Sequence, residues 1–158
     1  MRAYQVWTTL PGPLNHEIWQ SVYLQDKKLY RLAVQDMAEA LRKRPQALLE
    51  LPREARHELF RPLMGLPQFD VLGHNLVIKW LGSTRQAMLV DFLDALGIPH
   101  DGNGCAEQFP ETMTVARLKK AIAALYAKHD APAVSLYLHL FPSICGVNWP
   151  GLADHIQP

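Results

Sequence analysis

The chain has 158 residues, of which 49% are hydrophobic and 20% are charged. This length and composition are typical of one folded globular domain, and they exclude a disordered or low-complexity chain. The net charge is +1, made of +3 from residues 1–80 and −2 from the remainder. Such a mild imbalance disfavours nucleic acid as the main partner. No window approaches the roughly 18 consecutive apolar residues of a membrane-spanning helix, so no membrane association is expected.

The N-terminal segment and the cysteines indicate the compartment. Residues 1–14 lack a continuous apolar stretch and do not resemble a signal peptide. Cys105 and Cys145 lie far apart, and nothing else in the sequence points to an oxidising compartment. We therefore expect a cytoplasmic protein with both thiols reduced.

Residues 1–14 are predicted to form an extended arm. Tyr4, Val6 and Thr8 alternate along this segment, and Pro11-Gly12-Pro13 interrupts any regular element that follows. A strand would need a partner, and no second strand pattern is found. The arm is therefore expected to pack on the helices.

In the following part of the chain, apolar residues recur at three- and four-residue spacing, which predicts helices. Asn15 and Asp26 are suitable N-caps. The basic run Arg42-Lys43-Arg44 closes the helix that follows Asp26, where the helix dipole favours positive charge. Pro45 and Pro52 each suit the first turn of a further helix. The expected apolar face of the helix after Asp26 consists of Leu29, Ala33, Met37, Ala40 and Leu41.

Glycines and capping residues divide the second half in the same way. A helix over residues 69–81 is expected to end at Gly82, and Ser83 to cap the next helix. That helix ends at Gly97, with Ile98 as the apolar residue that often follows a helix-ending glycine.

The last two predicted helices start after Thr114 and Asp130, both of which are good N-caps. The final one contains the apolar segment 133–141, which we expect to be buried on most sides. A tail, 145–158, follows it.

These patterns predict an all-α fold. We expect a single compact array of about seven or eight helices packed at angles, because helices with one apolar face must cover one another. The predicted organisation is an extended arm over 1–14, a helical domain over 15–144 and an irregular C-terminal tail over 145–158, packed on the domain.

The segment 97–107 is the most conspicuous candidate site. It brings together an imidazole, two carboxylates, an amide and a thiol among glycines that allow the backbone to approach a ligand. Calcium-loop and dinucleotide motifs do not fit it, because an oxygen ligand and a third glycine are missing. It is either a solvated surface loop or a site, and the catalytic candidates are then His100, Asp101 and Cys105.

A metal centre is a second hypothesis. His74, His100-Asp101 and Asp130 occur in the order of the metal ligands in the all-helical HD phosphohydrolases. In that family, however, the His-Asp pair lies inside an apolar helix, whereas Pro99 precedes it here and a glycine-rich stretch follows. The chain is therefore not assigned to that family, and no metal or other cofactor is expected.

Two features could contact a partner. Trp149 lies in the tail and either fastens the tail to the domain or anchors a partner. Arg42, Lys43 and Arg44 could bind an anionic partner, although their position suits a helix terminus equally well.

The leading functional hypothesis is a non-enzymatic helical domain that acts by protein–protein contact. Its partner would be another protein or a second copy, since segment 133–141 is apolar enough for a dimer interface. The alternatives are a metal-dependent hydrolase with its site near 97–107, and a weak nucleic-acid binder using the basic helix over residues 27–44. Whether the protein is an enzyme stays open, with a non-enzymatic role favoured.

Overall fold

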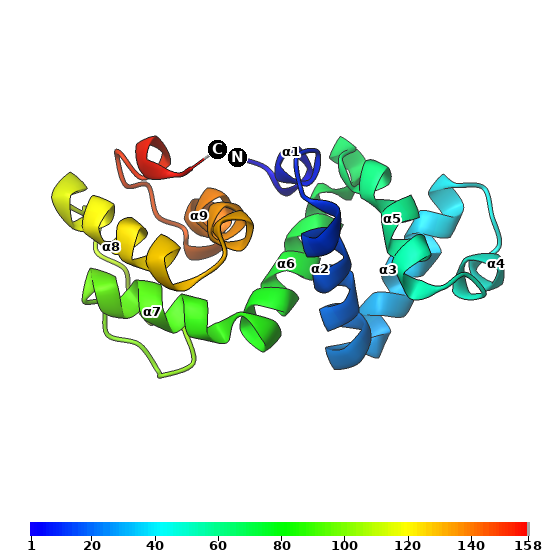
Figure 1. Ribbon diagram of the computed structural model, residues 1–158, viewed down its shortest axis with the longest axis horizontal. Coiled ribbons are helices and arrows are strands. Elements are labelled where there is room, and N and C mark those ends of the chain that lie inside the picture. Colours follow the sequence, from blue (N-terminus) through cyan, green and yellow to red (C-terminus); the bar gives the residue numbers. More distant parts are fainter. Residues whose placement is uncertain (158) are drawn as a thin grey trace. The chain divides into compact units, whose positions relative to one another are not determined.

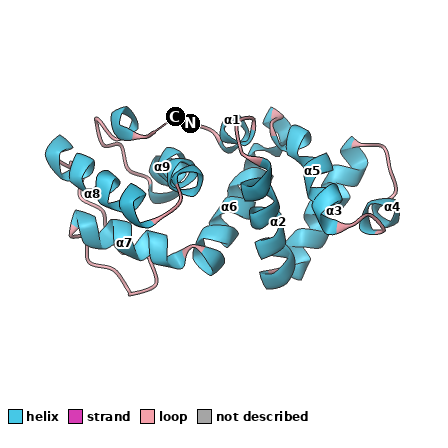
Figure 2. Ribbon diagram, viewed as in Figure 1, coloured by secondary structure: helices cyan, strands magenta, loops and turns pink. Residues whose placement is uncertain are grey.

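The computed structural model describes residues 1–157 and consists of helices and connecting loops (Figures 1 and 2). These residues form nine α-helices and two short 3₁₀ helices, and no strand is found among them. The predicted all-α fold is confirmed. The helices group into two compact units, Arg2–Ser83 and the chain from Thr84 onward. The sequence patterns had marked no boundary at this point.

The first unit contains six α-helices and one 3₁₀ helix. Their bounds are α1 (Ala3–Trp7), α2 (Gly12–Gln25), α3 (Lys27–Ala40), α4 (Pro45–Leu49), α5 (Arg53–Met64), η1 (Pro67–Phe69) and α6 (Asp70–Thr84). The interior is built around Trp19, Phe60 and Trp80, all fully buried. The Trp80 indole nitrogen donates to Glu17 Oε1 at 2.8 Å, so this buried ring keeps a polar partner.

The second unit contains three α-helices, and Figure 1 shows them close together. Their bounds are α7 (Gln86–Leu96), α8 (Val115–Lys128) and α9 (Ala131–Cys145), followed by η2 (Ala153–His155). Its core contains three rings, Phe92, Tyr137 and Phe141, packed edge to face with centroids 5.2 to 5.6 Å apart. Segment 133–141 is buried on most sides, as predicted.

The prediction of an extended arm over residues 1–14 is wrong. Residues 3–7 form a helix, and α2 already begins at Gly12. The helical conformation places Ala3, Val6 and Trp7 on one face, where all three are buried. Burial of Trp7 outweighs the alternation that suggested an extended chain.

Two predicted helix ends are also wrong. Asn15 is not an N-cap but a buried residue inside α2, where it accepts from Trp7 Nε1 at 3.1 Å and donates to the His57 carbonyl at 2.9 Å. Helix α6 continues through Gly82 and Ser83. The Ser83 hydroxyl donates to the Lys79 carbonyl at 2.6 Å and lies 3.1 Å from the Ser21 hydroxyl on α2, so it does not cap a new helix.

The other predicted caps are confirmed. Asp26, Thr114 and Asp130 each accept a hydrogen bond from the backbone N–H three residues later. Gly97 has φ 63° in the left-handed region, and the Ile98 N–H bonds to the Leu93 carbonyl at 2.9 Å. This is the glycine-terminated helix end that the sequence indicates.

Helix α3 ends at a residue under backbone strain. Arg42 has φ 52°, and it is the one non-glycine residue with a positive φ among residues 1–157. Its N–H bonds to the Glu39 carbonyl, and the Lys43 N–H bonds to the Ala38 carbonyl at 2.9 Å. This position of a helix end normally carries glycine.

Replacing Arg42 with glycine is therefore expected to raise the free energy of unfolding by about 0.5–1 kcal/mol, because it removes the left-handed strain. Urea unfolding would measure it. Gln35→Gly is the matched control, since Gln35 is exposed inside α3 and glycine within a helix should only destabilise. A loss of stability in both variants would contradict the prediction.

Candidate functional site

The loop between α7 and α8 is folded against its own unit. The Gln86 side chain donates to the Asn103 carbonyl at 3.1 Å, and the Trp149 indole nitrogen donates to the Pro110 carbonyl at 2.9 Å. Phe109 contacts the rings of Phe141 and Trp149, with centroids 5.8 and 6.3 Å away. The loop is therefore held partly by Phe141 and Trp149, two residues that follow it in the chain.

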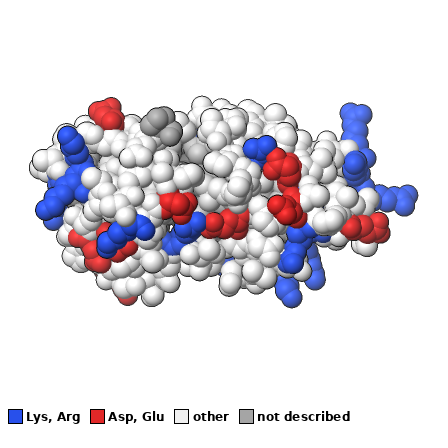
Figure 3. Space-filling model, viewed as in Figure 1, with Lys and Arg blue, Asp and Glu red and all other residues white. Residues whose placement is uncertain are grey.

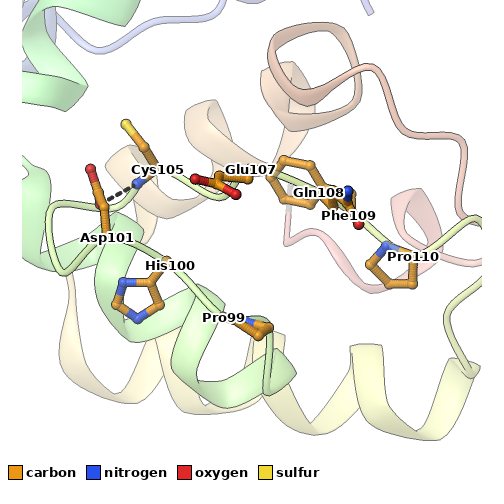
Figure 4. A pocket seen from close by; sticks show the side chains of 8 residues that line it. All are labelled: Pro99, His100, Asp101, Cys105, Glu107, Gln108, Phe109 and Pro110. Atoms are coloured by element: carbon orange, nitrogen blue, oxygen red, sulfur yellow. Dashed lines mark hydrogen bonds between the residues drawn. The ribbon is translucent and has the colours of Figure 1, made fainter.

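A pocket of about 610 Å³ opens along this loop (Figure 4). Figure 4 shows the Cys105 thiol and the Asp101 carboxylate on one side of the loop and the His100 ring on the other. The loop thus carries a cavity as well as reactive groups. The lining residues are Pro99, His100, Asp101, Cys105, Glu107, Gln108, Phe109 and Pro110.

The side chains of His100 and Asp101 form hydrogen bonds that stabilise the conformation of the loop. His100 Nε2 lies 2.8 Å from Asp94 Oδ1, and His100 Nδ1 accepts from the Gly102 N–H at 3.0 Å. Neither ring nitrogen is left free in this arrangement. Asp101 Oδ1 accepts from the backbone N–H groups of Asn103 and Cys105, and these bonds lower the pKa of the Asp101 carboxyl.

The two cysteines have different surroundings. Cys105 is exposed at the pocket, and Cys145 is half-buried at the end of α9; both are free thiols. Burial raises the pKa of Cys145 to about 12, which keeps its thiol protonated and unreactive.

The residues proposed for a metal centre do not belong to one unit. His74 lies on α6 in the first unit, whereas His100, Asp101 and Asp130 belong to the second. Asp130 caps α9 and pairs with Arg85 at 2.6 Å. Residues 1–157 contain no group of three or more His, Cys, Asp or Glu side chains arranged to hold a metal ion.

Trp149 is buried, with 4% of its surface exposed. It contacts Phe141 at 5.4 Å between centroids in addition to its bond to Pro110. In this position it fastens the tail to the second unit, one of the two roles considered for it.

Arg42, Lys43 and Arg44 are exposed at the turn between α3 and α4. Figure 3 shows Lys and Arg side chains gathered at this end of the first unit. None of the three forms an ion pair with a described residue. They remain candidates for contact with an anionic partner.

A groove in the first unit was not predicted. It has a volume of about 510 Å³ and runs between one face of α3 and the start of α6, with the ring of Phe69 among its lining. Two of its apolar side chains are strongly exposed, Leu32 at 51% and Val71 at 72%. We call this surface the α3–α6 groove. Its lining residues are Leu29, Leu32, Asp36, Glu39, Ala40, Gln68, Phe69, Val71, Leu72 and Asn75.

The apolar spacing of α3 does not reveal this groove, because it predicts Leu29 and Ala40 on the buried face of the helix. The buried face consists instead of Tyr30, Ala33, Val34, Met37 and Ala38. Helix α3 therefore has a second, partly apolar face in addition to the one it needs for folding. An excess of apolar positions over one helical stripe was the signal available in the sequence.

Comparison with known proteins identifies no matching family model, no matching curated protein and no matching solved structure. None of the helices within residues 1–157 combines the length and apolar character needed to cross a membrane.

Proposed function

We propose that this protein is a protein-interaction domain whose α3–α6 groove binds an amphipathic helix of its partner. The observation that carries the proposal is the exposure of Leu32 and Val71 on the two helices that border one groove. Isolated exposed apolar residues are ordinary, but apolar residues that line one groove from two helices match the helix-in-groove mode of recognition.

The charges of the groove specify the partner further. Asp36 and Glu39 line it from α3 and are exposed, and neither forms an ion pair with a described residue. No Lys or Arg lines the groove. The complementary ligand is a helix with an apolar stripe flanked by Lys or Arg, because such charges would pair with these carboxylates at the rim.

The test uses a fluorescent synthetic 18-residue peptide of leucine and lysine, patterned as an amphipathic helix. We expect a dissociation constant on the order of micromolar for the wild-type protein, as suits a small interface. Val71→Asp should weaken binding at least about tenfold, since a carboxylate would enter the apolar contact.

Two controls make the result specific. Ile78→Asp introduces the same charge at another exposed apolar residue of α6. Ile78 is 43% exposed on this helix but does not line the groove. It should leave binding unchanged. A peptide with glutamate in place of lysine should bind more weakly than the lysine peptide. Equal binding by both variants, or by both peptides, would reject the proposal.

A second copy of the chain is the alternative occupant. Light scattering of the wild-type protein would then show a dimer that Val71→Asp converts to a monomer. This result would replace the proposed partner helix with self-association through the same groove.

A further inference from the structure

A chain of hydrogen bonds crosses the interior of the first unit from Arg56 to His16. Arg56 Nη1 donates to the Tyr30 oxygen at 2.7 Å, and this oxygen lies 2.9 Å from His57 Nε2. His57 Nδ1 in turn lies 2.9 Å from His16 Nδ1. Arg56, Tyr30 and His57 are buried, whereas His16 is half-buried. The chain therefore connects the interior to a residue that reaches solvent.

The chemistry of the four groups favours one direction for each bond. A guanidinium can only donate, so the Tyr30 oxygen accepts from Arg56. Donation of the Tyr30 proton to His57 Nε2 gives this buried proton an acceptor. His57 must then carry its proton on Nδ1 and donate it to His16. His16 Nδ1 is consequently an acceptor, and the His16 ring is neutral in this arrangement.

The surroundings keep His57 neutral. Burial, followed by the positive charges of His16 when protonated, Arg56 and Arg53, lowers the pKa of His57 to about 3. These neighbours also disfavour a bound metal ion, because two of them are permanent cations. His16 is the member of the pair with access to protons from solvent.

The remaining titratable groups near the pair do not counteract the lowering of the His57 pKa. Burial raises the pKa of Tyr30, which keeps its hydroxyl protonated, and Tyr23 packs against it with centroids 5.2 Å apart. The carboxylates next in sequence to the pair are engaged elsewhere, Glu17 with Trp80 and Glu58 with Arg61.

We infer that the His16–His57 pair is an acid-sensitive latch between α2 and α5, which opens when His16 takes up a proton. A protonated imidazole donates from both nitrogens, so two N–H groups would face each other across the 2.9 Å contact. Moving the His57 proton to Nε2 would let His57 accept from His16, but the buried Tyr30 proton would then have no acceptor among residues 1–157. Acid therefore opposes this side-chain bond between the two helices, whereas the bond from Asn15 to the His57 carbonyl has no titrating partner.

The tautomers provide the first test. Imidazole nitrogen NMR spectra of the wild-type protein at pH 8 should show His57 protonated on Nδ1 and His16 protonated on Nε2. On acidification, the His16 signals should move to the doubly protonated form while His57 stays neutral. Protonation of His57 on Nε2 at pH 8 would overturn the proposal, and this readout needs no variant.

Proton linkage provides the second test. His16→Gln keeps an acceptor for His57 at every pH but cannot take up a proton, so its stability at pH 8 should stay near that of the wild type. Below about pH 6.5, the wild-type folding constant should fall up to about tenfold more per pH unit than that of the variant. The sign follows from the geometry, because a second N–H on His16 faces the His57 Nδ1–H in the folded protein and only water in the unfolded chain.

His57 contributes to the pH dependence of both proteins, but its pKa is lowered less in His16→Gln because the charge of His16 is absent there. Its lowered pKa gives stability that is complete above pH 6.5 and is lost as the pH falls toward 3. His74→Gln, which removes another half-buried histidine of the same unit, should retain the wild-type pH dependence. Identical pH dependence in wild type and His16→Gln would overturn the latch.

Discussion

Replacing Arg56 with methionine is expected to lower the free energy of unfolding by about 3–5 kcal/mol. Arg56 is 4% exposed, and its guanidinium donates to the carbonyls of Leu48, Leu49 and Leu51 at 2.7 to 2.8 Å. It also donates to the Tyr30 hydroxyl at 2.7 Å. Methionine fills a similar volume without donors, so four acceptors would lose their partner together.

The position of these carbonyls adds to the effect. They lie at or just beyond the C-terminal end of α4, where the helix dipole is negative and a cation is favoured. A five-residue helix has little stability of its own, so Arg56 holds α4 in place. Amide hydrogen exchange in residues 45–51 should therefore accelerate in the variant.

Arg53→Met is the matched control. Arg53 is exposed on the same helix and only lies over the Tyr23 ring, 4.5 Å from its centroid. Its replacement should lower the free energy of unfolding by at most about 1 kcal/mol. Equal losses in the two variants, measured by urea unfolding, would show that the carbonyl contacts of Arg56 do not form.

Replacing Gly104 with alanine is expected to lower the free energy of unfolding by about 2–4 kcal/mol. Gly104 has φ 88°, a region that other residues avoid. An added Cβ would also lie 2.5 Å from Leu89 Cβ on α7, so the loop would have to move away from the helix. In the variant, backbone strain and steric overlap with Leu89 would therefore both destabilise the loop at residue 104.

Gly102→Ala separates these two causes. Gly102 has φ 83°, but a Cβ there meets no atom within 4 Å. This variant should lose only the strain energy, about 1–2 kcal/mol. A loss as large as that of Gly104→Ala would mean that packing of Gly104 on Leu89 contributes nothing. Thermal unfolding of both proteins would provide the comparison.

The parts of the fold that could be predicted are those determined by nearby residues. Asp26, Thr114 and Asp130 cap the helices that follow them, and Gly97 ends α7 as expected. In each case the deciding hydrogen bond joins residues three to five positions apart. A helix end of this kind can therefore be predicted from the residues around it.

The wrong predictions concern helix ends whose conformation depends on residues far away in the sequence. Asn15 is a capping residue by type, but its partners are Trp7 and the carbonyl of His57, 42 positions away. Ser83 stays helical and bonds to Lys79 and to Ser21. Short-range propensity cannot reveal contacts of this kind, because they depend on which helices become neighbours.

The candidate sites divide in the same way. The loop over 97–107 could be identified because its reactive groups are neighbours in sequence, and the structure places a pocket beside them. The histidine latch could not, since His16 and His57 are 41 positions apart and Arg56 resembles a surface charge of a helix. The α3–α6 groove required knowing which apolar face of α3 is buried.

The attachment of the loop by Trp149 has a consequence for the order of folding. Trp149 bonds to a carbonyl 39 positions earlier and completes the group of rings formed by Phe92, Phe109, Tyr137 and Phe141. During synthesis on the ribosome, α7 and α8 emerge well before this ring. We therefore expect that the second unit cannot complete its fold until Trp149 has been synthesised. The loop should then adopt its native conformation in a late kinetic step.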